Sequence, residues 1–197
     1  MKNLNWHRLW QGPIFFFCLL VVAACSDYRQ ARSAYEAGDY VKAFQILERL
    51  SKAGDSQAQY DLSQMYLQGI GTSKNIEQGW NWMNQAAKKG NVQAMIELAL
   101  RYQKSPQLET SAAMTFQWFE KAAYAGSAAG QYNLAHLYLD GNGVAVNDEQ
   151  AYVWMVLASE SGYPIAASEA KVIAQKLSAG QIERCNSQIE ALKKQMP

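Results

Sequence analysis

The chain has 197 residues, of which 49% are apolar, 18 are basic and 17 are acidic. This length suits one compact domain with a sizeable core, and the apolar content excludes general disorder. If the N-terminal segment considered next is removed, Lys2 and Arg8 are lost, and 16 basic residues face 17 acidic ones. That balance gives no electrostatic footprint for nucleic acid, so we expect no nucleic-acid partner.

Residues 1–24 have the pattern of a secretory signal. Basic residues precede the apolar run IFFFCLLVVAA over 14–24, which is short for a membrane-spanning helix of about 20 residues. The run ends in VAAC, and Val22–Cys25 resembles a bacterial lipobox. The resemblance implies cleavage before Cys25, followed by diacylglycerol modification and acylation of that residue. The alternative is an ordinary signal-peptidase site with an unmodified Cys25.

Several acyl chains on Cys25 would hold the protein stably to a membrane. By resemblance to Gram-negative lipoproteins, Ser26 after the cysteine favours the outer membrane, with the protein facing the periplasm. Cys185 would then be the remaining thiol, because Cys18 lies in the signal, so no internal disulfide is expected. We expect Cys185 to be a packing residue of a helix and not a nucleophile.

The mature part of the chain repeats itself. Gly54, Gly90, Gly126 and Gly162 are spaced by 36 residues, and three tryptophans at 82, 118 and 154 keep the same interval. A period of 20–50 residues is typical of a solenoid.

Each period predicts two helices. The second half has apolar or small residues at i, i+3, i+4 and i+7, the stripe of an amphipathic helix, and the closing glycine predicts a left-handed C-terminal cap. The first half has a second stripe, and paired glycines in two connections predict tight turns with positive φ. These stripes and turns are, in chain order, Ala43-Ile46-Leu47-Leu50, Ala58-Leu62-Met65-Tyr66, Gly69-Gly71, Gly79-Trp82-Met83-Ala86, Thr115-Trp118-Phe119-Ala122, Gly130-Leu134-Leu137-Tyr138, Gly141-Gly143 and Ala151-Trp154-Met155-Ala158.

The segments AQYDLSQMYLQGIGTSKNIEQGWNWMNQAAKKG and GQYNLAHLYLDGNGVAVNDEQAYVWMVLASESG resemble Sel-one-like repeats, relatives of the tetratricopeptide repeat. The resemblance implies an all-α fold, a right-handed α-solenoid of about five antiparallel helix pairs with a 36-residue repeat. The expected organisation is a signal peptide (1–24), a first, tetratricopeptide-like pair after the lipidated N-terminus (25–55), three Sel-one-like repeats (56–162, divided as 56–90, 91–126 and 127–162) and a C-terminal capping pair (163–197). Ser178 and Gln181 predict a capping box for the last helix.

The sequence contains no motif for catalysis. His136 and Cys185 are too few for a typical zinc site, and the paired glycines lack the Lys-Ser/Thr that closes a phosphate loop. We therefore predict no catalytic residue, no metal ligand and no cofactor, and a protein that is not an enzyme. The tryptophan column could form an aromatic ladder for sugars, but its i, i+3 and i+4 partners favour a place in the core.

In related superhelices, outward positions of the first helix of each pair line the concave surface. The repeat register places nine residues there: Tyr60, Gln64, Gln68, Ile96, Leu100, Lys104, Tyr132, His136 and Asp140. Aromatic and aliphatic side chains beside polar groups would suit a peptide or an extended partner segment. The alternative is that these residues pack against the first helix of the next pair.

The resulting hypothesis is a lipid-anchored adaptor that binds other proteins of the bacterial cell envelope. A different hypothesis is an envelope protein that acts on or binds peptidoglycan or another glycan, which a carboxylate pair or exposed tryptophan rings in the groove would favour. A third is a cytoplasmic or secreted repeat protein without lipid.

Overall fold

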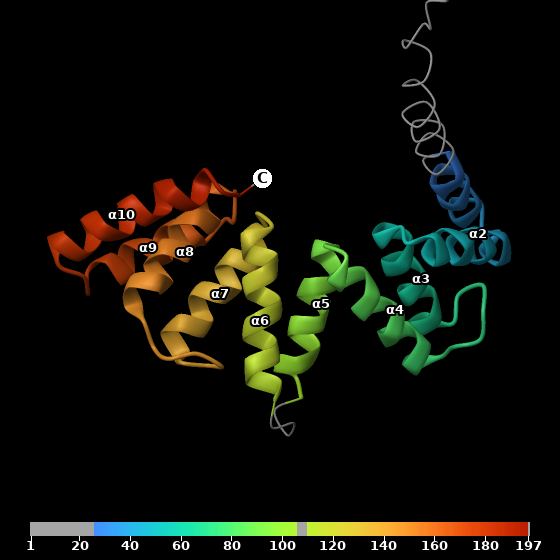
Figure 1. Cartoon of the computed structure of the whole chain (residues 1–197), viewed down its shortest axis with the longest axis horizontal. Helices are drawn as coiled ribbons and strands as arrows, with labels where there is room; N and C mark the ends of the chain where they lie inside the picture. Colours follow the sequence, from blue (N-terminus) through green and yellow to red (C-terminus); the bar gives the residue numbers. More distant parts are fainter. Residues whose placement is uncertain (1–25, 106–109, 197) are drawn as a thin grey trace, which may run out of the picture. The chain divides into compact units, whose positions relative to one another are not determined.

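The computed structural model describes residues 26–105 and 110–196, and every regular element in these residues is an α-helix. The chain divides into two compact units, residues 1–86 and 87–197, which we describe one at a time. Along the described residues the helices follow one another as five pairs (Figure 1). The all-α class and the solenoid of repeated helix pairs are confirmed, whereas the expected signal peptide and Cys25 lie outside the described residues.

The first unit contains three complete helices and most of a fourth: residues 26–36, α2 (Tyr40–Ala53), α3 (Ser56–Gln68) and α4 (Ile76–Lys88). Asp39, Asp55 and Asn75 precede the last three helices, and each accepts a hydrogen bond from a backbone N–H three residues later. These side chains satisfy donors that a helix start leaves without an intrahelical partner, and they fix where the helices begin.

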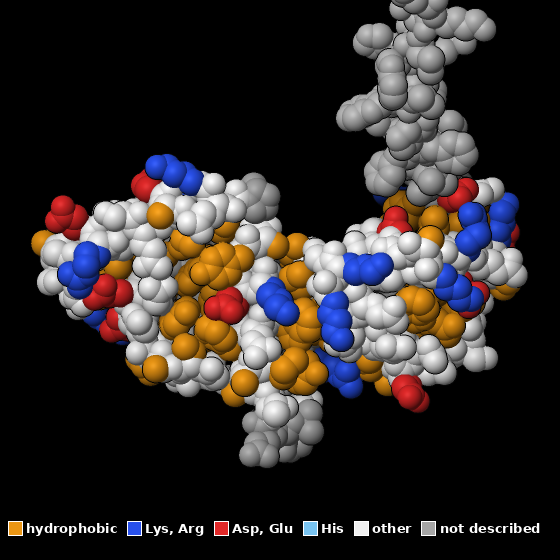
Figure 2. Space-filling model, viewed as in Figure 1, with side chains coloured by type: hydrophobic (Ala, Val, Ile, Leu, Met, Phe, Trp, Pro, Cys, Tyr) orange, Lys and Arg blue, Asp and Glu red, His pale blue; other side chains and the backbone are white. Residues whose placement is uncertain are grey.

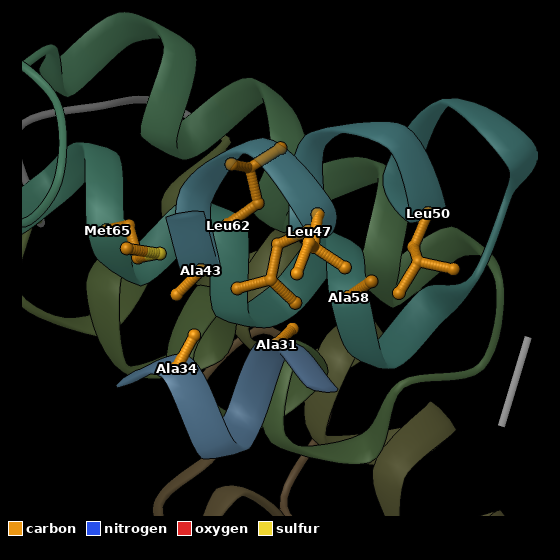
Figure 3. Packing of buried hydrophobic residues seen from close by; sticks show 9 residues of the cluster. Ala31, Ala34, Ala43, Leu47, Leu50, Ala58, Leu62 and Met65 are labelled. Atoms are coloured by element: carbon orange, nitrogen blue, oxygen red, sulfur yellow. The ribbon is translucent and has the colours of Figure 1, made fainter. Parts of the chain in front are cut away.

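The core of the first unit forms where three helices meet (Figure 3). α2 contributes the predicted stripe, in which Ala43 and Leu47 are buried, and α3 contributes Leu62 and Met65. Helix 26–36 adds two alanines, whose small side chains let it lie close to α2 and α3. No helix could bury its apolar face alone, so the pairs depend on stacking.

The second unit contains six helices: α5 (Val92–Gln103), α6 (Ser111–Tyr124), α7 (Ala128–Asp140), α8 (Asp148–Glu160), α9 (Ala166–Ala174) and α10 (Ala179–Lys193). α6 packs against α5 and α7, and α8 packs against α7, α9 and α10. Trp118, Phe119, Trp154 and Met155 fill the core, each 4% exposed or less. On the face that Figure 2 presents, hydrophobic side chains also gather at the surface over α7.

Glycines end the second helix of the first four pairs. Gly54, Gly90, Gly126 and Gly162 have φ of 98°, 92°, 80° and 87°, the left-handed region that other residues avoid. The predicted left-handed stops are confirmed. They explain why glycine returns at a fixed interval.

Two further glycines let the connections lie against a neighbouring helix pair. A Cβ at Gly71 would collide with the carbonyl oxygen of Tyr40, and a Cβ at Gly143 with that of Ala112. Both glycines also have positive φ, 69° and 77°. The turns therefore need glycine for the close approach as well as for the backbone angle.

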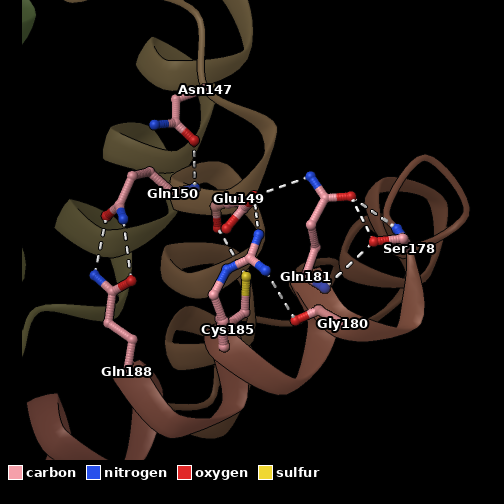
Figure 4. Close-up of polar contacts among 9 residues, drawn as sticks. Asn147, Glu149, Gln150, Ser178, Gly180, Gln181, Cys185 and Gln188 are labelled. Atoms are coloured by element: carbon pink, nitrogen blue, oxygen red, sulfur yellow. Dashed lines mark hydrogen bonds and ion pairs between the residues drawn. The ribbon is translucent and has the colours of Figure 1, made fainter.

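The last helix closes the second unit through polar contacts with α8 (Figure 4). Ser178 and Gln181 form the predicted capping box at its start. Gln181 and Arg184 both donate to Glu149 on α8, at 2.9 and 3.0 Å, and the amides of Gln150 and Gln188 exchange two hydrogen bonds. Beneath this layer, three residues of α10 are buried: Cys185, Ile189 and Leu192.

Candidate functional site

A pocket of about 420 Å³ opens in the first unit between helix 26–36 and α3. Both are the first helices of their pairs, which is where the groove is expected. The lining residues come from these two helices, with Leu47 of α2 and the connection after α3: Tyr28, Ala31, Arg32, Tyr35, Glu36, Leu47, Asp61, Gln64, Met65, Gln68 and Ile70.

The floor of this pocket is apolar. Ala31, Leu47 and Met65 line it and are 1%, 4% and 2% exposed, because they also belong to the core of the first unit. Figure 3 shows the three side chains directed toward one another from helix 26–36, α2 and α3. The floor is thus held by core packing and is preformed.

One wall of the pocket carries a half-buried carboxylate. Asp61 accepts a 2.6 Å hydrogen bond from the hydroxyl of Tyr28 and a 3.0 Å bond from the side-chain amide of Gln57. Burial raises the pKa of Asp61, although the hydrogen bonds from Tyr28 and Gln57 oppose the rise. Burial, and then the contact with Asp61, also raises the pKa of the Tyr28 hydroxyl. Both donors are neutral, so the wall keeps a negative charge when Asp61 is ionised.

The rim of the pocket is polar and accessible. Arg32 Nε donates to Glu36 Oε1 at 2.9 Å, one turn apart on the same helix, and both side chains are more than 60% exposed. An exposed ion pair of this kind contributes little to stability. The ring of Tyr35, which also lines the pocket, meets the ring of Tyr40 edge to face, with centroids 5.1 Å apart.

The structure places two of the nine predicted groove residues at this pocket. Gln64 and Gln68 line it, whereas Tyr60 is half-buried on α3 and is not among its lining residues. On α5, Ile96 and Leu100 are half-buried, and Lys104 is the exposed residue that ends the helix.

On α7 the predicted groove residues pack against the following first helix, α9, and its preceding turn. Tyr132 stacks on Tyr163 with ring centroids 4.2 Å apart, and its hydroxyl donates to Glu169 at 2.9 Å. Burial and the contact with Glu169 raise the pKa of Tyr132 to about 12. His136 Nε2 lies 2.9 Å from Glu169 Oε2 without the alignment of a hydrogen bond, and Asp140 is exposed at the end of α7.

Sequence reasoning missed the pocket residues of helix 26–36. Tyr28, Arg32 and Glu36 stand at the same helical positions as the three predicted groove residues of α3, but each precedes its counterpart by 32 residues, not 36. The shorter turn of the first pair hides them from a fixed period. An alignment of the repeats with a four-residue deletion before Tyr40 would have matched these three residues to the groove positions. Asp61 comes one residue after the predicted groove residue Tyr60.

The tryptophans and Cys185 do not form a second candidate site. Trp118 and Trp154 are buried, and Trp82 packs against the core of the first unit, so these rings do not form a surface ladder for sugars. Cys185 is 1% exposed, and burial raises the pKa of its thiol. In the described part of the chain, no group of three or more His, Cys, Asp or Glu side chains is placed to hold a metal ion. None of the helices in residues 26–105 and 110–196 is long and apolar enough to cross a membrane.

Helix pairs repeated in both units, with a preformed pocket between first helices, define an α-solenoid of the repeat-protein class. The model of the Sel1 repeat matches residues 27–55, 56–91, 92–127 and 128–163, and the chain belongs to the Sel1 repeat family. Proteins with these repeats generally act as protein–protein interaction scaffolds and are typically non-catalytic.

Solved structures and a curated relative show the same repeats in other organisms. A Sel1 repeat protein from Oxalobacter formigenes is 31% identical, with a TM-score of 0.61 over 64% of this chain and 96% of that one. A protective antigen of uropathogenic Escherichia coli that displays an SLR fold has a TM-score of 0.58 over 87% of this chain and 46% of that one; at 23% identity it shows the fold alone. A putative sel1-like repeat-containing protein of Acanthamoeba polyphaga mimivirus is 28% identical over 89 residues, which is 44% of this chain but 15% of the viral protein.

Proposed function

We propose that this chain is a non-catalytic adaptor that holds a protein partner in the pocket of its first unit. The observation that carries the proposal is the pocket itself, with a volume of about 420 Å³, a buried apolar floor and a polar rim. Ligand sites commonly combine a mostly apolar lining with a few placed polar groups. The scaffold role that is general among Sel1 repeat proteins supports the same function.

The adaptor is anchored by lipid on Cys25 and faces the periplasm from the outer membrane. This part of the proposal rests on the lipobox-like VAAC and on Ser26. Tyr28, which lines the pocket, follows Cys25 by three residues. An anchor at Cys25 would therefore keep the pocket close to the membrane surface, and a partner in the envelope fits that position.

Site-specific photocrosslinking in living cells tests the adaptor function. Probes at Gln64 and Gln68 lie in the pocket, a probe at His136 lies where α7 packs against α9, and Lys176 is an exposed control. We expect one discrete protein adduct from the two pocket positions and none from Lys176, with mass spectrometry naming the partner. A correctly localised protein without any adduct from the pocket would refute the adaptor function.

The anchor is tested separately by comparing Cys25→Ser with Cys18→Ser. Cys18 lies inside the apolar run, so its replacement should leave the protein lipidated and in the membrane fraction. Cys25→Ser should remove the lipid mass and leave either precursor or released protein. If Cys25→Ser were processed normally and stayed membrane-bound, the lipid anchor would be wrong. If the wild-type protein and Cys25→Ser were both processed and both released from the membrane fraction, a secreted protein would be favoured.

One observation favours the alternative of an envelope protein that acts on glycans. Two carboxylates, Glu36 and Asp61, line the same pocket, and glycoside hydrolysis generally uses a carboxylate pair. Incubation of purified peptidoglycan with the protein, followed by chromatography of the released fragments, distinguishes the two functions. New fragments that disappear in both Glu36→Gln and Asp61→Asn would establish the enzyme, whereas unchanged peptidoglycan supports the adaptor.

A further inference from the structure

We propose that the pocket of the first unit binds a basic side chain, lysine or arginine, presented by the protein partner. The inference deepens the adaptor function and rests on it. It names the chemistry of recognition, which Asp61, the groups around it and a comparison between the two units support.

Asp61 offers a negative charge that its hydrogen-bond donors do not neutralise, and Arg32, which interacts with it electrostatically, makes its ion pair with Glu36. Its carboxylate receives hydrogen bonds from the hydroxyl of Tyr28 and the amide of Gln57, neither of which carries charge. Each carboxylate oxygen can accept a further hydrogen bond. A charged donor from a ligand would therefore add a charge-assisted bond, the stronger kind, without displacing either neutral donor.

The other charged residues of the lining reinforce this preference. Arg32 is already paired with Glu36 across 2.9 Å, so one cation and two carboxylates face the pocket, a balance of −1. An acidic ligand would have to compete with Glu36 for the guanidinium of Arg32 and would also approach Asp61. A basic ligand meets Asp61 directly and can approach Glu36 at the rim.

The second unit contains the same arrangement with an imidazole beside the carboxylate. Tyr132 and Glu169 on α7 and α9 correspond in the repeat register to Tyr28 and Asp61, and they make the same hydroxyl-to-carboxylate contact. There, His136 places its imidazole 2.9 Å from Glu169. The residue that corresponds to His136 in the first unit is Arg32, whose guanidinium turns to Glu36 instead. The position next to the carboxylate, which an imidazole takes in the second unit, is thus open to a ligand beside Asp61 in the first unit.

The shape of the pocket fits a long basic side chain. Lysine and arginine carry an aliphatic stem that can lie on apolar surface while the charged head reaches a polar group. The apolar floor formed by Leu47 and Met65 offers that surface, and Asp61 is on the wall above it. The rings of Tyr28 and Tyr35 add faces that attract cations.

The test uses four peptides that differ at one residue, acetyl-Gly-Gly-Xaa-Gly-Gly-amide with lysine, arginine, norleucine or glutamate at Xaa. Each is titrated into ¹⁵N-labelled full-length protein, and the amide signals of Gln64 and Gln68 are followed by NMR. Signals of Gln150 in the second unit report non-specific effects. We expect the lysine or arginine peptide to shift the pocket signals with a dissociation constant on the order of 1 mM, as one side chain allows.

Two variants separate charge from folding. Asp61→Asn keeps an oxygen for the hydroxyl of Tyr28 but removes the charge. It should raise the dissociation constant of the basic peptide by about tenfold or more. Glu48→Gln removes one carboxylate of α2 that pairs with Lys52 outside the pocket, and it should leave binding unchanged. The chemical shifts of the core amides show that both variants fold.

The outcomes separate this inference from the adaptor function. Equal binding of lysine and norleucine peptides, preference for glutamate, or no shift with any peptide overturns the basic-side-chain inference. If the Gln64 crosslink then survives in cells, the adaptor function stands with another kind of ligand. If the basic peptide binds but no crosslink forms, the pocket chemistry is right and the adaptor function is wrong.

Discussion

Tyr28 donates a 2.6 Å hydrogen bond to Asp61 across two neighbouring first helices of the first unit. In the second unit Tyr132 makes the corresponding 2.9 Å bond to Glu169, also between neighbouring first helices. A tyrosine hydroxyl and a carboxylate thus join consecutive pairs within each unit. The tyrosine ring packs between the helices while its hydroxyl donates a hydrogen bond to the carboxylate. In the first unit, the same residue therefore contributes to helix packing and to the polar wall of the pocket.

Replacement of Tyr28 by phenylalanine tests the strength of this contact. The ring remains, but Asp61 stays half-buried with one donor fewer, so we expect a loss of about 1–2 kcal/mol in the free energy of unfolding. Urea denaturation measures it. The matched control is Tyr40→Phe, which removes a hydroxyl from an exposed ring and should change stability by less than about 0.5 kcal/mol. Equal losses in the two variants would contradict a stabilising role of the hydroxyl bond.

The pH dependence of stability tests the environment of Asp61. Burial raises its pKa above the ordinary 3.8. The folded state therefore binds more protons than the unfolded state just above that pH, and this group lowers stability as pH rises through its folded pKa. Asp61→Asn removes the effect, so its stability relative to wild type should rise as pH increases above the ordinary pKa of 3.8.

Glu149→Gln provides the opposite case for the same measurement. Hydrogen bonds from Gln181 and Arg184 lower the pKa of Glu149 below 4.5, so its contribution is present above that pH and is lost on acidification. The stability of Glu149→Gln relative to wild type should therefore fall as pH rises. Denaturant unfolding at several pH values gives both curves, and curves of the same sign would show that one environment is assigned wrongly.

Much of the fold could be predicted because its determinants are local. A left-handed glycine such as Gly126 ends a helix through its own backbone angle, and the stripe at Trp118 and Phe119 follows from helical spacing. Ser178 and Gln181 satisfy each other within one turn. Each of these features needs only neighbours in sequence, so the amino-acid sequence is sufficient to place it.

The candidate site was predicted only in part because it depends on contacts between pairs. The repeat register predicts Gln64 and Gln68 in the groove, and both line the pocket. Which helix face remains open depends on what the next pair presents. Tyr163 covers Tyr132 with a stacked ring, and nothing in the spacing of the repeat indicates this. Asp61 lines the pocket beside Tyr28 of the preceding pair, a contact that the spacing of the repeat does not indicate either.

Cys185 should be chemically protected in the folded protein. Its side chain is buried between α10 and α8, where the sulfur contacts the carbonyl oxygen of Glu149, and burial raises the pKa of the thiol. Alkylation by iodoacetamide requires thiolate and access, so it should be slow until α10 detaches. Peptide mapping by mass spectrometry reads Cys185 separately from the other cysteines. Labelling in native buffer as fast as in urea would contradict the docked position of α10.

Gly143 and Gly162 have similar backbone angles but different surroundings, with φ of 77° and 87°. No atom lies within 4 Å of a Cβ built at Gly162, so Gly162→Ala should cost only the left-handed strain, about 1–2 kcal/mol. A Cβ at Gly143 would collide with the backbone of Ala112, which adds an overpacking cost and gives roughly 2–5 kcal/mol in total.

Thermal and urea unfolding of the two alanine variants measure the difference. If both variants lost the same stability, the turn at Gly143 would not lie against α6, because backbone strain alone would account for both. A larger loss in Gly143→Ala than in Gly162→Ala supports the close approach. It would also explain why the connections at Gly71 and Gly143 each keep a second glycine, although one left-handed residue is enough to end a helix.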